Sequence, residues 1–148
     1  MHTVATEPGS TAATATATDA FDPLFRSTVW SLGVGGFAIG TGEFVIMGLL
    51  PEVAADLGVS IPQAGHVISA YALGVVVGAP LLAVVTAHWP RRLLLVALMA
   101  LFALGTLASA AAPGYLSLNL LRFAAGTPHG TYFGVASLVV ASLAPPGR

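Results

Sequence analysis

Four long apolar stretches constrain this chain more than any other feature. They cover about residues 27–50, 64–87, 93–111 and 117–143. A helix needs roughly 20 apolar residues to cross the ~30 Å hydrocarbon core of a bilayer, and each stretch approaches or exceeds that length. Apolar residues occupy every face of each predicted helix, as in helices surrounded by lipid. The sequence therefore predicts an all-α membrane protein with four transmembrane helices.

The composition supports lipid as the solvent. Of 148 residues, 56% are hydrophobic and only 7% are charged, against roughly 25% charged in an ordinary soluble domain. The five basic residues do not cluster with aromatic residues, so nucleic-acid binding is not expected. The chain has no cysteine, and its histidines show no metal-ligand spacing. We therefore expect no metal or cofactor. We expect no enzyme activity either, because no serine or aspartate pairs with a histidine at a hydrolase-like spacing.

The segments outside the apolar stretches carry turn residues or low-complexity sequence. Residues 1–22 are rich in threonine and alanine, lack the features of a signal peptide, and are expected to form a disordered cytoplasmic tail. Residues 23–148 form the membrane domain. Its connections are a stretch bounded by Pro51 and Pro62, a second at 88–92 and a third at Pro113-Gly114.

The arginines predict the orientation. Four of the five basic residues fall on one side if the helices alternate across the membrane: Arg26, Arg91, Arg92 and Arg148. The opposite loops hold Glu52 and Asp56 and no basic residue. Because basic loops stay in the cytoplasm, we expect a multi-pass protein of the cell (inner) membrane with both termini cytoplasmic.

Two charged residues lie inside the apolar stretches, Glu43 in the first and Arg122 in the fourth. A charge at mid-bilayer costs ~2.5–3.5 kcal/mol on insertion scales, so a functional role is the default interpretation. The two lie roughly 10 Å and 8 Å from the outer ends of their helices, at ~1.5 Å per residue. They are candidates for a proton, cation or substrate site, and His129 is a candidate proton relay. The alternative is polar packing or snorkelling near the outer rim.

Glycines four residues apart recur in three of the four stretches. The residues are Gly36, Gly40, Gly74, Gly78, Gly126, Gly130 and Gly134. Such pairs let helix backbones approach closely. Helix packing within the chain is the expected use, and homodimerisation is the minor alternative. Pro80 and Pro128 are each expected to kink a helix.

Several segments resemble one transporter family. Residues 42–60 read GEFVIMGLLPEVAADLGVS, and the motifs YALG at 71–74 and GAPLL at 78–82 follow. These segments resemble the first two helices of major facilitator superfamily transporters, in particular the arabinose-efflux-permease-like branch of the twelve-helix drug:proton antiporters. The resemblance covers about residues 27–148.

Two motifs of that superfamily match in part. Its cytoplasmic gating-loop motif, G-x-L-x-D-R-x-G-R-R/K, matches here only in Arg91 and Arg92, and its acidic residue is absent. Its fourth-helix pattern R-x-x-x-G-x-x-x-G is matched by Arg122, Gly126 and Gly130, with Pro128 as a departure.

The resemblance implies both a fold and a function. Family members have twelve helices in two halves, each built from two three-helix inverted repeats, with the substrate site near the midplane. The chain then corresponds to the N-terminal third of such a fold, a partial transporter domain whose C-terminal helices are missing. Helices one and four line the family's cavity, which agrees with the positions of the two buried charges. The implied function is proton-coupled efflux of a small molecule such as a drug or sugar.

Two alternatives remain open. One is a self-contained four-helix exporter that works as a dimer, of the small multidrug resistance kind. The other is a membrane protein fragment, or pseudogene product, that does not transport.

Overall fold

The computed structural model describes residues 23–144, and the only regular secondary structure in this part of the chain is helical. The predicted tail at 1–22 and Arg148 lie outside the described residues. The predicted all-α class is confirmed for the described part. Its helices are α1 (Pro23–Gly48), α2 (Leu50–Leu57), α3 (Ile61–Ala64), α4 (His66–Val85), α5 (Arg91–Ala110) and α6 (Tyr115–Leu143).

Three segments of the described chain are long and apolar enough to cross a membrane. They are Pro23–Gly48, Ile61–Val85 and Arg91–Ala110, and they coincide with the first three predicted spans. The fourth predicted span coincides with α6, which has 29 residues but is not among the three. That α6 crosses the membrane therefore stays a prediction.

Helix α6 carries polar side chains, and two of them bond to other helices. Thr131 Oγ1 donates to the Ala79 carbonyl of α4 at 3.1 Å. Tyr132 Oη donates to the Leu32 carbonyl of α1 at 3.0 Å. Polar groups satisfied inside a bundle do not face lipid, so the polarity of α6 is compatible with a central position.

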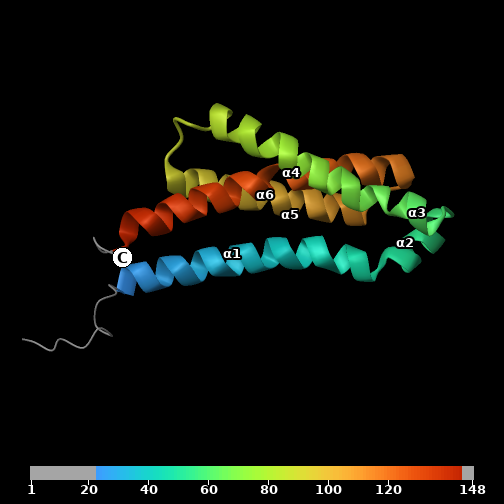
Figure 1. Ribbon diagram of the computed structural model, residues 1–148, viewed down its shortest axis with the longest axis horizontal. Helices are drawn as coiled ribbons and strands as arrows, with labels where there is room; N and C mark the ends of the chain where they lie inside the picture. Colours follow the sequence, from blue (N-terminus) through green and yellow to red (C-terminus); the bar gives the residue numbers. More distant parts are fainter. Residues whose placement is uncertain (1–22, 145–148) are drawn as a thin grey trace, which may run out of the picture.

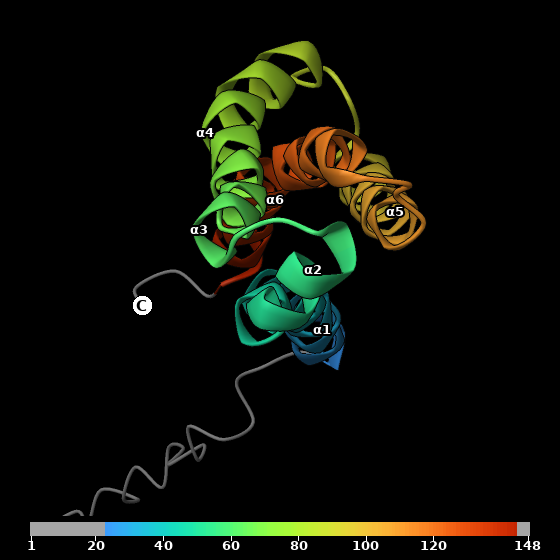
Figure 2. The same ribbon diagram turned by 90° about the vertical axis from the view of Figure 1, so that its right-hand side faces the viewer.

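Helix α6 is the centre of the bundle. It packs most extensively against α4 and then α5, while α1 touches α4, α5 and α6 only sparsely. Figures 1 and 2 show α1 lying alongside the other helices as a separate rod. The core lies between the helices and consists of Ile39, Tyr71, Leu94, Leu98, Phe102, Ala125, Tyr132 and Ala136.

Glycines bring α4 and α6 into backbone contact. Those involved are Gly74, Gly78, Gly126 and Gly130. A Cβ at Gly74 would overlap the Phe123 carbonyl of α6, and one at Gly126 would overlap the Tyr71 carbonyl of α4. Close backbone approach of this kind is what small residues permit in membranes.

The close packing of the remaining glycines does not follow the four-residue spacing in the sequence. A Cβ at Gly36 would lie 3.1 Å from the Phe133 ring, whereas one at Gly40 would meet nothing within 4 Å. Glycines outside the spaced pairs are also closely packed: Gly35 against Tyr132, Gly42 against Phe102, and Gly105 against Ala125. The pattern therefore identified the α4–α6 contact and Gly36 on α1, but not the other close contacts of α1 and α5.

The first connection is more ordered than the sequence suggested. Where a loop between Pro51 and Pro62 was expected, Leu50–Leu57 forms α2, because Pro51 is tolerated in the first turn of a helix. The helix ends at Gly58, whose φ of 64° is the left-handed conformation that favours glycine. Ser60 then caps α3 through a capping box with Gln63.

The bundle has two chemically different ends. The start of α1, the 86–90 turn and the end of α6 lie together at one end (Figure 1). We call this the arginine end, after Arg26, Arg91 and Arg92. The opposite end holds α2 and α3, and we call it the acidic end, after Glu52 and Asp56.

Candidate functional site

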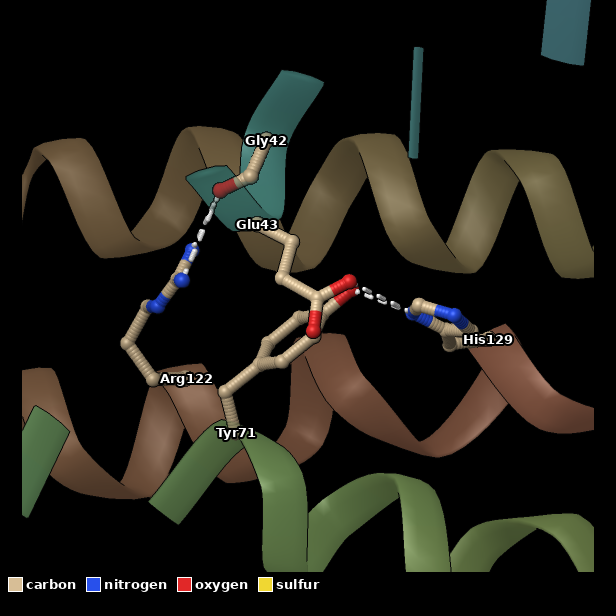
Figure 3. A network of polar contacts seen from close by, with 5 residues as sticks. All are labelled: Gly42, Glu43, Tyr71, Arg122 and His129. Carbon is tan, nitrogen blue, oxygen red and sulfur yellow. Dashed lines mark hydrogen bonds and ion pairs between the residues drawn. The ribbon is translucent and has the colours of Figure 1, made fainter. Parts of the chain in front are cut away.

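A polar cluster lies inside the bundle where α1, α4 and α6 meet. It contains Glu43 of α1, Tyr71 of α4, and Arg122 and His129 of α6 (Figure 3). Arg122 and His129 are seven residues apart in one helix, so both point from the same face, two turns apart. The structure therefore brings three of the predicted residues together and adds a fourth, Tyr71.

The carboxylate of Glu43 faces His129. Its Oε2 lies 3.9 Å from His129 Nδ1, and the side chains are 37% and 17% exposed, respectively. This carboxylate is the more accessible partner, open on one side and in contact with an imidazole on the other. Such a group can exchange a proton with a cavity and with its neighbour.

Tyr71 connects the two halves of the cluster. Its hydroxyl lies 3.0 Å from His129 Nδ1, and its ring lies under the Arg122 guanidinium, 4.6 Å from Cζ to the ring centroid. This distance is within the range of a cation–π contact. Sequence reasoning did not assign Tyr71 to the site. A signal was present, because Tyr71 precedes Gly74 by three residues and Gly78 by seven, and therefore shares the face that meets α6.

Arg122 is buried and is directed at backbone. It is 4% exposed, and its Nη1 and Nη2 lie 3.4 Å and 3.5 Å from the Gly42 carbonyl oxygen. Within residues 23–144, the one carboxylate that lies within 4 Å of a basic side chain is that of Glu43, and its neighbour is His129 and not Arg122. Arg122 therefore contacts the backbone next to Glu43, and it forms no direct ion pair with the Glu43 carboxylate.

Arg91 and Arg92 lie outside this cluster. They begin α5 after Pro90, and they line a cavity of about 660 Å³ at the arginine end together with Ser27, Ser31 and Ser142, among others. The structure thus places the predicted gating-loop arginines beside the start of α1 and the end of α6.

The remaining histidines of the described chain do not join the cluster. His66 Nδ1 lies 2.7 Å from the Tyr115 hydroxyl at the acidic end, and Tyr115 Oη donates to the Gln63 carbonyl at 3.1 Å. His88 is exposed in the 86–90 turn. In the described range, no three His, Cys, Asp or Glu residues gather as metal ligands would.

Known proteins are similar to this chain over most of its length. Residues 32–148 match the family model of the Major Facilitator Superfamily. The chain is 51% identical over 115 residues to the inner membrane transport protein YdhP of Escherichia coli, and 42% identical over 123 residues to the putative transporter AraJ of the same species. It is 37% identical over 117 residues to a chloramphenicol resistance protein of Streptomyces lividans. No solved structure matches the chain.

The matches cover most of this chain but only part of each relative. They include 78%, 83% and 79% of the chain, respectively, but 30%, 31% and 30% of the relatives. The chain therefore spans about three tenths of the length of these curated relatives.

Proposed function

This chain belongs to the major facilitator superfamily, and on that premise we propose that it forms the first part of a transporter that exports a small molecule in exchange for protons. The printed names of its relatives, which include a transport protein and a chloramphenicol resistance protein, support small-molecule efflux. The polar cluster supports a proton as the coupling ion.

Glu43 is the proposed proton carrier. The observation that carries this assignment is that its carboxylate faces His129, while the Arg122 guanidinium is directed to the Gly42 carbonyl. A permanent pair with arginine would hold the carboxylate charged, whereas an imidazole partner can itself accept or release a proton. His129 and Tyr71 then form the continuation of the proton route.

Arg122 is a positioning residue in this proposal. Its guanidinium contacts the carbonyl immediately before Glu43 and rests on the Tyr71 ring. It therefore fixes α1 against α4 and α6 at the level of the carrier.

The arginine end is the proposed cytoplasmic end. Arg26 lies near the start of α1, and Arg91 and Arg92 begin α5. Both helix starts are at this end of the bundle (Figure 1), and basic segments favour the cytoplasm. In this orientation both ends of the described chain are cytoplasmic in the inner membrane, and the Arg91–Arg92 pair occupies the gating loop.

Further helices are the proposed partners of α1, together with lipid. Helix α1 contacts the other helices sparsely, and its apolar face includes the exposed residues Trp30, Phe37 and Phe44. In the family fold, additional helices and a second half complete the substrate cavity. The dimeric four-helix alternative gains no support from the glycines at the α4–α6 contact, because they already pack within the chain, whereas a Cβ at Gly134 of α6 would meet nothing within 4 Å.

A chimaeric transporter tests whether Glu43 carries the proton. Residues 32–144 replace the corresponding helices of the Streptomyces lividans chloramphenicol resistance protein, and chloramphenicol efflux is measured in vesicles with an imposed proton gradient. Glu43→Gln should reduce gradient-driven efflux at least tenfold at unchanged expression. Glu52→Gln, at the acidic end, is the matched control and should leave efflux unchanged. Undiminished efflux with Glu43→Gln would remove Glu43 as the carrier.

A further inference from the structure

The cavity at the arginine end has walls of three chemical kinds. It has a volume of about 660 Å³ and is lined by the start of α1, the start of α5 and the end of α6. Arg91 and Arg92 contribute cationic groups, serine and threonine side chains contribute hydroxyls, and leucine and valine side chains form the rest. The volume is within the roughly 300–1,000 Å³ of ligand cavities. No residue of the Glu43 cluster lines it, so it is a separate site.

The polarity of the wall falls from the end of the bundle toward its interior. Arg91 and Arg92 begin α5, and Val96 follows about one turn further in. Ser142 lies in the last turn of α6, and Val139 precedes it by about one turn. At ~1.5 Å per residue, both valines lie roughly 5 Å deeper than the polar residues. A phospholipid has the same order of chemistry, with its polar headgroup at the membrane surface and its acyl chains in the hydrocarbon core.

The two arginines of this cavity have no acidic neighbour. None of the residues that line the cavity is acidic, and the first turn of α5 has no acidic residue. Among residues 23–144, neither Arg91 nor Arg92 has a carboxylate within 4 Å. Arginine binds phosphate through paired N–H donors. An anionic headgroup therefore complements the cavity, whereas the ammonium of a zwitterionic headgroup would find no carboxylate in its lining.

The α1 wall of the cavity faces into the bundle. Thr28 and Leu32 line the cavity, and each is two residues from Trp30, so they lie about 160° from it round the helix. Trp30 belongs to the apolar face for which we propose further helices, and the cavity is therefore on another side of α1. Tyr132 of α6 donates to the Leu32 carbonyl, so a contact within the chain holds this wall in place.

We propose that this cavity binds the headgroup of an anionic phospholipid, with the phosphate at Arg91 and Arg92 and an acyl chain along Val96 and Val139. Basic pockets between membrane helices suit such headgroups. The bound lipid joins α1, which contacts the other helices sparsely, to α5 and α6. Its place in the cytoplasmic leaflet rests on the proposed function and its orientation, whereas binding of the headgroup does not.

Native mass spectrometry of the 148-residue chain tests this site. Purified protein in detergent is titrated with phosphatidylglycerol, which is anionic, or with phosphatidylethanolamine, which has no net charge, both with the same acyl chains. The first phosphatidylglycerol should bind at least tenfold more tightly than the first phosphatidylethanolamine. Arg91→Gln and Arg92→Gln should each weaken phosphatidylglycerol binding about fivefold, since a basic residue beside an anionic membrane contributes about that much.

Two further variants separate the cavity from the general charge of this end. Arg26→Gln is the matched control, because Arg26 carries the same charge near the start of α1 but does not line the cavity, and it should leave the affinity unchanged. Ser142→Trp fills the mouth of the cavity at an exposed position without changing the charge, and it should weaken binding at least fivefold. Circular dichroism verifies that each variant is helical.

Four results would overturn the lipid site. Equal weakening by Arg26→Gln would show diffuse attraction to the basic end, and equal affinity for the two lipids would show that charge does not select the occupant. Unchanged affinity in both Arg91→Gln and Arg92→Gln would show that the lipid binds elsewhere. Displacement by an equal concentration of inorganic phosphate would show a site for a free anion. Glu43→Gln should bind lipid normally, so failure of this site and failure of the proposed carrier are distinguishable.

Discussion

The Arg122 guanidinium points to the Gly42 carbonyl, whereas the carboxylate of the next residue, Glu43, points to His129. The guanidinium nitrogens lie 3.4 Å and 3.5 Å from the Gly42 oxygen, and Glu43 Oε2 lies 3.9 Å from His129 Nδ1. Arg122 of α6 and Glu43 of α1, the two charges predicted inside the membrane, therefore contact neighbouring positions and form no direct ion pair. Each then has its own role, and substitutions at the two positions should not compensate.

A double substitution tests this independence. In the chimaera, Glu43→Gln removes the carrier and Arg122→Gln removes the contact that positions α1. Gradient-driven chloramphenicol efflux by the double variant should stay as low as that of the weaker single variant, because neither loss repairs the other. Recovery of efflux in the double variant would show that the residues act as a charge pair and that Glu43 is not the carrier.

Tyr71→Phe separates packing from proton relay. The variant keeps the ring beneath Arg122 and removes the hydroxyl bonded to His129. We expect a stability loss of about 0.5–1.5 kcal/mol, typical of one hydrogen bond, and a gradient-driven efflux lowered about tenfold. Tyr115→Phe removes a comparable hydroxyl contact at the acidic end and should cost similar stability with normal efflux. Equal efflux in the two variants would exclude Tyr71 from the relay.

Gly126→Ala tests the close contact of α4 and α6. The added Cβ would overlap the Tyr71 carbonyl, and overpacking of this kind costs about 1–3 kcal/mol. Gly40→Ala is the matched control, because its Cβ would meet nothing within 4 Å although Gly40 belongs to a similar spaced pair. Unfolding of the 148-residue chain by detergent titration measures both. Equal stability of the two variants would contradict the packing described here.

The sequence predicted the helices and their buried charges better than it predicted their contacts. Length and apolarity determine a span, and spaced glycines identified the surface that joins α4 to α6. The rotation of each helix about its axis depends on packing by distant residues. For that reason the partner of Glu43, the role of Tyr71, and the packing of Gly35 and Gly105 were not predictable from spacing. Helix α2 was missed because its two-turn pattern lies between prolines that suggested a loop.

The chain alone should not transport. Helix α1 contacts the other helices sparsely, and the second half that completes the substrate site in the family fold is not part of residues 23–144. Purified 148-residue chain in vesicles with a proton gradient should move chloramphenicol no faster than empty vesicles. Robust gradient-driven flux, dependent on Glu43, would instead favour the dimeric four-helix exporter.

The last prediction concerns α6 and the membrane. Its 29 residues are long enough to span a bilayer, at ~1.5 Å per residue, although its composition does not place it among the three candidate spans. Because its polar side chains bond to α1 and α4, we expect it to cross as the fourth span. Reporter fusions after positions 57 and 112 should report an outer location, and fusions after positions 90 and 148 a cytoplasmic one. The fusions after positions 112 and 148 flank α6, so the same reporter location for both would mean that α6 does not cross the membrane. A cytoplasmic signal at 57 would reverse the orientation proposed from the arginines.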